Sequence, residues 1–166
     1  VEKYNYFSTK LMGDSCKVVE LCLKLLRTVE KNHASTMAAS LLKTLAHHKE
    51  DSLSKIVDAE GVWVLTNLIV KDTNNLRLAC AAFILKTLAS NRPCMSQKIA
   101  NTNMVVAKLK EHVLVPQAVA CTSLDDAKIL RESCAELLQT LVMELRHAKI
   151  ESDDEPPRKR SRTVAC

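Results

Sequence analysis

Apolar positions in the middle of the chain recur with the spacing of α-helices. From Val62 to Lys71, and again from Leu76 to Ser90, apolar residues return every three or four positions, which places them on one helix face. The polar cluster over residues 72–75 is typical of a turn, and Asn91 to Pro93 ends the second stretch because proline cannot continue a helix. Upstream, Lys55 to Gly61 predicts a short helix that ends at a glycine in the left-handed conformation.

Further helices are expected on both sides of this unit. Residues 14–48 predict two helices, and a last helix follows Asp125 and Asp126 and runs to about Ile150, with the two acids complementing the dipole at its start. The last helix is more polar than the others, as suits the end of a stack. The candidate N-cap residues of the first two helices are Asp14 or Ser15 and Ser35 or Thr36.

A short pattern repeats along the chain. Leu-Lys-Thr-Leu-Ala begins at Leu42 and again at Leu85, 43 residues later, and Lys55-Ile56 returns at the same offset as Lys98-Ile99. A looser third copy begins at Leu138, after a longer interval of 53 residues. A period near 43 falls in the range of about 40–47 residues that armadillo and HEAT repeats show. The pattern therefore predicts stacked helical repeats.

The unit from Lys55 to Ser90 resembles the armadillo repeat, with its short, medium and long helices. Gly61-Val62 resembles the opening of the family's second helix, and Leu85 to Ala89 resembles the end of its third. The resemblance covers roughly residues 14–147 and implies an all-α fold, a right-handed armadillo-like α-solenoid of about three repeats. The charged composition after residue 150, with few apolar residues, predicts a disordered C-terminal tail. The expected organisation is an N-terminal lead-in from a preceding region over 1–13, an armadillo-like repeat domain over 14–150 and a tail over 151–166.

The third unit departs from the period by ten extra residues between Glu111 and Leu124. We expect them to lengthen the connection between its second and third helices. Insertions of this kind map to loops on one face of a solenoid, which is often the binding face. A neutral surface insertion explains the same residues, and the two interpretations stay open.

The same resemblance implies a groove lined by the third helices. Threonines stand where the family has its groove asparagine, and Ser40, Phe83 and Glu136 stand where nuclear-import receptors carry tryptophan. The tryptophan–asparagine ladder is absent, which argues against an import receptor. With two lysines beside the threonines, the groove is expected to take an acidic or helical partner; ordinary solvated positions are the alternative. The candidate partner-binding residues are Ser40, Lys43, Thr44, Phe83, Lys86, Thr87, Glu136, Gln139 and Thr140.

Composition supports helices and argues against several chemistries. Hydrophobic residues make up 47% of the chain and aromatic residues 3%, with two glycines, which favours helix over β-structure and leaves no phosphate-cradling loop. No stretch reaches the roughly 18 apolar residues of a membrane span. Because the chain begins at Val1 and not at an initiator methionine, we expect it to be the C-terminal part of a longer protein. Its N-terminus also lacks the basic-then-apolar pattern of a signal peptide.

The cysteines and histidines do not form a recognisable site. The seven cysteines include no Cys-x-x-Cys pair, so we expect free thiols in a reducing compartment. His47 and His48 are adjacent and diverge on a helix, so they are interpreted as surface residues at a helix end, and Trp63 is interpreted as a packing residue. We expect no catalytic residues, metal or cofactor. The cysteines within apolar helical runs are Cys16, Cys22, Cys80 and Cys134.

The tail changes character at Glu151, where an acidic block is followed by Pro156-Pro157 and a basic block. The basic block resembles a monopartite nuclear localisation signal that an importin binds, although a merely solvated tail is the alternative. Ser152 and Ser161 are candidate phosphorylation sites. The tail therefore favours a nuclear and/or cytoplasmic location. The signal residues are Arg158, Lys159, Arg160 and Arg162.

Taken together, these patterns predict a non-enzymatic protein–protein interaction scaffold or adaptor. A cytoskeletal or centrosomal scaffold explains everything except the tail. A nucleic-acid-binding module is the less favoured alternative, because the net charge is only +5 and few aromatic residues are present to stack on bases. Its basic face would require alignment of Lys43, Lys86, Lys98, Lys108 and Lys110.

Overall fold

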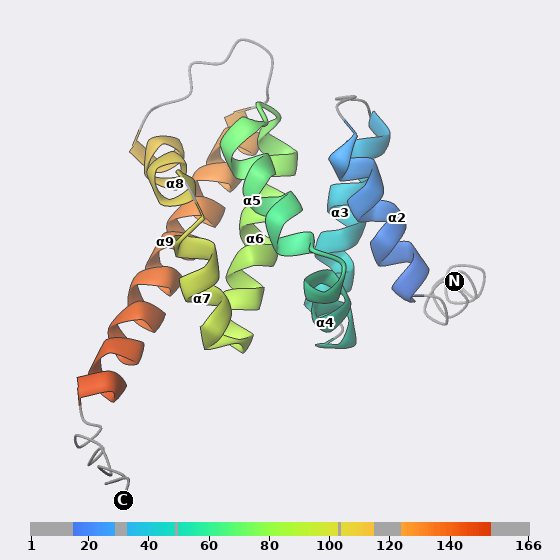
Figure 1. The fold of residues 1–166 in the computed structure, drawn as a ribbon. Helices are drawn as coiled ribbons and strands as arrows, with labels where there is room; N and C mark the ends of the chain where they lie inside the picture. Colours follow the sequence, from blue (N-terminus) through green and yellow to red (C-terminus); the bar gives the residue numbers. More distant parts are fainter. Residues whose placement is uncertain (1–14, 29–32, 49, 103, 115–123, 154–166) are drawn as a thin grey trace, which may run out of the picture.

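The computed structural model describes residues 15–28, 33–48, 50–102, 104–114 and 124–153, and these are almost entirely helical (Figure 1). No strand occurs within them, so the all-α prediction is confirmed. The helices are α2 (Ser15–Arg27), α3 (His33–His48), α4 (Glu50–Asp58), α5 (Gly61–Lys71), α6 (Asn75–Asn91), α7 (Pro93–Ala100), α8 (Val105–Leu114) and α9 (Leu124–Asp153).

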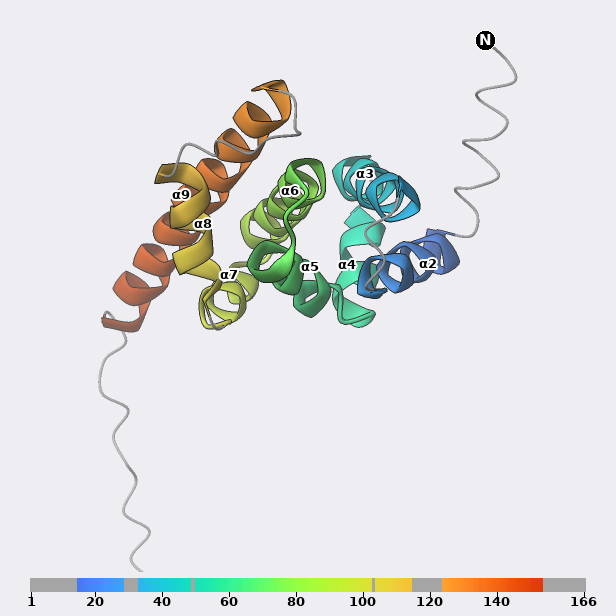
Figure 2. The same cartoon turned by 90° about the horizontal axis from the view of Figure 1, so that it is seen from above.

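The longest helices, α3, α6 and α9, lie side by side in chain order, with α6 between the other two (Figure 2). Each of these three helices is covered by the helix that directly precedes it in the chain. Helix α2 packs on α3, α5 packs on α6, and α8 packs on α9. The short helices α4 and α7 open the two complete units, α4–α5–α6 and α7–α8–α9. The chain therefore passes twice through the same short–medium–long order.

Helix α6 is the centre of the hydrophobic core. It contacts α3 on one side, α9 on another, and also α5 and α7. Its small residues Ala79 to Ala82 are buried and let the neighbouring helices approach closely, while Ile84, Leu85 and Leu88 are completely buried. Because α6 is covered from several directions, its apolar residues surround it instead of forming one stripe.

A buried ion pair closes the turn between α5 and α6 and ties it to α3. Arg77 Nε donates to Asp72 Oδ2 at 2.6 Å and Nη2 to Oδ1 at 2.8 Å, while Nη1 donates to the hydroxyl of Ser35 at 2.6 Å. The side chains of Arg77 and Asp72 are only 4% and 5% exposed. Asn74 caps α6 by accepting from the backbone N–H of Arg77 at 3.0 Å, as an N-cap asparagine does.

The pKa of Asp72 reflects two opposing effects. Burial alone would raise the pKa of this carboxyl, but hydrogen bonds from Arg77 and from the backbone N–H groups of Asn74 and Thr73, with the charge of Arg77, hold the pKa below its ordinary value. The carboxylate is therefore ionised in the folded protein, and it supplies the counter-charge that the buried guanidinium requires.

Three predicted helix boundaries differ from the observed ones. Helix α4 begins at Glu50, five residues before the predicted start at Lys55. Helix α3 begins at His33, so Ser35 and Thr36 lie inside it and do not cap it; the hydroxyl of Ser35 accepts from Arg77 instead. Helix α9 continues to Asp153, three residues into the predicted tail. In each case the helix extends beyond the residue at which the sequence pattern placed its start or its end. Ser15 is the first residue of α2, and Asp14 lies outside the described residues.

Gly61 has a different role from the predicted one. The left-handed residue is Glu60, with φ of 57°, and Gly61 does not have a positive φ. Gly61 instead begins α5 next to Ile56 of α4, where a Cβ atom would lie 2.5 Å from both Cγ2 and the carbonyl oxygen of Ile56. The glycine is required because α4 and α5 approach too closely for any side chain.

The exposed face of α9 is less polar than predicted. Arg131, Glu132 and Glu136 are exposed, but Val142 and Met143, in the second half of the helix, are exposed as well. The predicted insertion falls between α8 and α9, where residues 115–123 lie outside the described part, as do the lead-in and the tail beyond Asp153. Of the described helices, none is long and apolar enough to cross a membrane.

We expect Asp72→Asn to lower the free energy of unfolding by about 3–5 kcal/mol at neutral pH, because it leaves Arg77 buried without its counter-charge. The pKa of Asp72 is lowered in the folded protein. Its stabilising contribution is therefore present above the ordinary carboxyl pKa and is lost as the pH falls through the folded-state pKa. Urea unfolding at neutral and acidic pH measures the free energy of unfolding of the unchanged chain and of Asp72→Asn. The difference between the two values should become smaller in acid.

The matched control is Asp58→Asn, because Asp58 is an exposed acid on α4. This variant should change stability by less than about 0.5 kcal/mol. Equal losses in the two variants would contradict a special role for the Asp72–Arg77 pair.

Gly61→Ala should destabilise the protein by about 1–3 kcal/mol, because the new Cβ atom meets the backbone of Ile56. At an ordinary helical position, the same change stabilises by up to about 1 kcal/mol. Thermal or urea unfolding shows whether Gly61→Ala lowers or raises the stability of the protein, and the sign of this change therefore tests the close approach of α4 and α5. Ser90→Ala, at an exposed position of α6, provides the control, and a more stable Gly61→Ala protein would refute the close-approach explanation.

Candidate functional site

The nine candidate partner-binding residues lie on three neighbouring helices. Three are on α3, three on α6 and three on α9, and these helices pack in that order. We call the surface formed by these nine residues and by His47 the groove surface. The structure thus brings together residues that lie far apart in the sequence.

A lysine bridges each of the two lines along which neighbouring helices meet on the groove surface, which we call the α3–α6 seam and the α6–α9 seam. The ammonium nitrogen of Lys43 lies 4.9 Å from the centroid of the Phe83 ring, a cation–π distance. Lys86 Nζ lies 2.8 Å from Glu136 Oε2. Lys43, Lys86 and Gln139 hold equivalent repeat positions. Lys43 contacts the residue three places before Lys86, and Lys86 contacts the residue three places before Gln139. The α3–α6 and α6–α9 seams therefore use the same side-chain register.

A hollow of about 440 Å³ opens between α3 and α6 on this surface. Ser40, Lys43, Thr44 and Phe83 line it, together with residues that the repeat pattern did not single out. The most informative of these is His47, whose ring centroid is 5.9 Å from that of Phe83. His47 follows Lys43 by one helical turn, so helical spacing alone could have placed it on this face. The additional lining residues are His47, His48, Leu76 and Cys80.

The three groove threonines use their hydroxyl protons within their own helices. Thr44 donates to the carbonyl oxygen of Ser40 at 3.1 Å, Thr87 to that of Phe83 at 2.9 Å, and Thr140 to that of Glu136 at 2.9 Å. A hydroxyl has one proton to donate, so each threonine faces solvent mainly as an acceptor. Lys43, the Phe83 ring and the paired side chains of Lys86 and Glu136 are consequently the main features that this surface offers to a partner.

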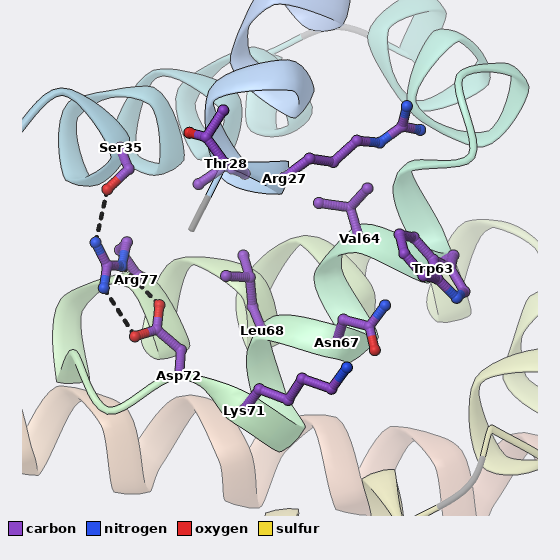
Figure 3. Close-up of a pocket in the computed structure, with 11 residues that line it drawn as sticks. Arg27, Thr28, Ser35, Trp63, Val64, Asn67, Leu68, Lys71, Asp72 and Arg77 are labelled. Carbon is purple, nitrogen blue, oxygen red and sulfur yellow. Dashed lines mark hydrogen bonds and ion pairs between the residues drawn. The ribbon is translucent and has the colours of Figure 1, made fainter. Parts of the chain in front are cut away.

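A second cavity, also of about 440 Å³, lies between α2, α3, α5 and α6 (Figure 3). It shares no lining residue with the groove hollow. Trp63 stands at its edge with 60% of its surface exposed, so the interpretation of Trp63 as a packing residue is wrong. Sequence reasoning missed this cavity because its walls come from four helices, and no local spacing signals that Trp63 lies on the outer side of α5.

The lysines proposed as a basic face are partly neutralised and dispersed. Lys86 pairs with Glu136, and Lys108 Nζ lies 2.7 Å from Glu111 Oε2. The hydrogen bond and the charge of Lys108 lower the pKa of the exposed Glu111. Lys98 and Lys110 are exposed on α7 and α8, away from the α3–α6 seam. The five lysines thus come from four helices, and two of them are already paired with acids.

Within the described ranges, no group of three or more His, Cys, Asp or Glu residues is placed to hold a metal ion. Asp125 and Asp126 lie in the first turn of α9, and both histidines of the His47-His48 pair are exposed in the last turn of α3. Their rings contact each other edge to face, with centroids 4.8 Å apart, so the expectation that the two side chains diverge is wrong. These positions match the helix-end interpretation given to them.

Three of the cysteines are buried free thiols: Cys22, Cys80 and Cys134. Burial raises the pKa of each, and it raises that of Cys134 to about 12. A thiol with so high a pKa forms almost no thiolate at neutral pH and is a poor nucleophile. Cys94 is exposed, whereas the side chain of Cys16 lies outside the described part.

The signal residues of the tail, Arg158, Lys159, Arg160 and Arg162, lie outside the described residues, as does Ser161. Ser152 falls within the final turn of α9.

Comparison of the chain with protein-family models, with curated proteins and with solved structures finds no match. The site is accordingly interpreted from its own geometry.

Native alkylation with iodoacetamide at neutral pH should label Cys94 much faster than the three buried thiols, by at least about tenfold. Peptide mapping by mass spectrometry measures each site separately. In denaturing urea the rates should converge, which provides the internal control. Labelling of Cys134 as fast as Cys94 in the native protein would contradict its burial.

Proposed function

We propose that this chain is a non-enzymatic interaction module whose groove surface binds an acidic segment of another protein. The observation that carries the proposal is the repeated lysine contact across both seams, Lys43 on Phe83 and Lys86 on Glu136. The same register at both seams gives one continuous surface across three helices, and extended partner segments need such a surface.

The helix order supports an armadillo-like solenoid as the framework of this function. Two units repeat the short–medium–long order, and the third helices of successive units lie next to each other. In solenoids, adjacent repeats build an extended surface from equivalent positions. A right-handed stack of this kind, acting as the C-terminal part of a scaffold or adaptor, is the architecture we propose.

The charge of the groove hollow favours an acidic partner. Lys43 lies over the half-buried Phe83 ring, His47 and His48 also line the hollow, and the lining contains no carboxylate among the described residues. Because the groove threonines donate to their own helices, they contribute little to gripping a partner backbone. Attraction of carboxylates to Lys43, with apolar contact on Phe83, is the expected mode of binding.

Nucleic acid is a weaker candidate for this surface. Phosphate binding requires several unpaired cations along one face, but Lys86 and Lys108 are each paired with a glutamate. A cytoskeletal or centrosomal scaffold agrees equally well with the helical framework. Importin binding through Arg158, Lys159, Arg160 and Arg162, and with it a nuclear as well as cytoplasmic location, remains part of the proposal.

Affinity capture from a nuclease-treated cell extract tests the proposal, with the whole chain immobilised at about 0.15 M salt. The variant Lys43→Glu/Lys86→Glu reverses the charge of the groove surface and places a second carboxylate beside Glu136. We expect it to reduce the specifically bound proteins by at least about tenfold, because like charges across an interface are strongly unfavourable.

The matched control is Lys98→Glu/Lys110→Glu, which makes the same change of charge at exposed positions of α7 and α8. It should retain binding. Equal loss in both variants would indicate attraction to net charge alone. If nuclease removes all captured material, or modest salt does so, the nucleic-acid alternative replaces the groove proposal.

A further inference from the structure

We propose that the cavity edged by Trp63 is a second binding site, which takes an extended peptide segment with an apolar side chain between acidic ones. The site is independent of the groove surface, because the two hollows share no lining residue. Its volume of about 440 Å³ lies within the range of about 300–1,000 Å³ that is typical of ligand pockets.

The exposed tryptophan is the first observation that points to a ligand. Trp63 is the only tryptophan in the chain, and it is 60% exposed at the cavity edge. Leaving so large an apolar ring in water is unfavourable, and tryptophan is enriched among residues that dominate binding energy at interfaces. Behind it, Leu26, Val64 and Leu68 form an apolar wall, which suits an aliphatic side chain.

The spacing along α5 favours an extended peptide over a compact molecule. Trp63, Asn67 and Lys71 follow one another at four-residue intervals, which corresponds to about 6 Å along a helix. Side chains on one side of an extended peptide recur at about 6.6–6.8 Å, so the two rows nearly match. Figure 3 shows these three residues along the α5 side of the cavity, opposite Arg27 of α2.

The polar groups of this row specify the peptide further. The Asn67 amide can both donate and accept, which suits a backbone amide of the ligand. Lys71 is exposed and makes no ion pair within the described residues, so its ammonium group can bind a carboxylate. The row therefore offers an apolar contact, a backbone contact and a cation in sequence.

The charge balance around the cavity is positive. Asp72 lines the cavity, but both of its oxygens bond to Arg77, so its charge is neutralised. On the opposite wall, Arg27 Nη2 donates to the carbonyl oxygen of Ala59 at 3.0 Å and approaches Glu60 at 3.4 Å. Glu60 has a 79% exposed side chain, so a carboxylate of the ligand can replace this solvated contact. Acidic side chains therefore complement the rim.

The fluorescence of Trp63 provides a direct test, because no other tryptophan contributes. The probe is the acetylated, amidated peptide Glu-Leu-Glu-Leu-Glu, titrated into the whole chain at about 0.15 M salt. We expect a saturable blue shift as the peptide covers the ring. Lys71→Glu should weaken binding by at least about tenfold through like-charge repulsion, and Lys98→Glu, the same change at an exposed position of α7, should leave the affinity unchanged.

Two control peptides separate charge from shape. Lys-Leu-Lys-Leu-Lys keeps the apolar side chains and reverses the charge, and Glu-Ser-Glu-Ser-Glu keeps the charge and removes the apolar side chains; neither should produce the shift. The absence of a saturable shift with the first peptide, equal binding of either control, or normal binding by Lys71→Glu would each overturn the proposal. Binding that Lys43→Glu weakens and Lys71→Glu does not would place the peptide on the groove surface, which supports the proposed function and excludes this second site.

Discussion

The buried contact of Arg77 with Asp72 and Ser35 connects three levels of the structure. At the local level, the Asp72 carboxylate accepts from the backbone of Thr73 and Asn74 and so shapes the turn from α5 into α6. At the next level, Arg77 in the first turn of α6 reaches back to α3. A guanidinium can do this because its N–H donors point in several fixed directions. The relative position of α3 and α6, on which the groove surface depends, is therefore specified by hydrogen bonds as well as by apolar packing.

Much of the helical framework could be predicted from periodicity alone. The limits of α5 and α6 differ from the predicted ones by a single residue at each changed end, because Asn74 and Pro93 are strong local signals. Ser35, Gly61 and Trp63 were misinterpreted because their roles are set by residues distant in the sequence or by the outer surface of the fold. Arg77 lies 42 residues from Ser35, and no pattern within one helix indicates that the two meet.

The groove surface was accessible to sequence reasoning because repetition carries three-dimensional information. Once equivalent positions are aligned, residues 43 apart are expected on neighbouring helices. The alignment predicted which helix faces adjoin, but it did not predict the one-turn offset that pairs Lys43 with Phe83 and Lys86 with Glu136. That offset results from how neighbouring helices slide along each other as their side chains interlock. The Trp63 cavity had no comparable signal, since it lies where several helices meet.

The central position of α6 has a consequence for how the fold opens. Neighbours cover α6 from several directions, and its residues include many of the most deeply buried side chains. Its backbone amides can therefore exchange with solvent only when most of the structure unfolds, whereas α2, whose contacts are mainly with α3, α4 and α5, can detach at lower cost. Helix α2 can therefore loosen, or adjust to a partner, while α6 holds the hydrophobic core intact. Binding of a partner at α2 would then alter the local opening of this helix without unfolding the protein as a whole.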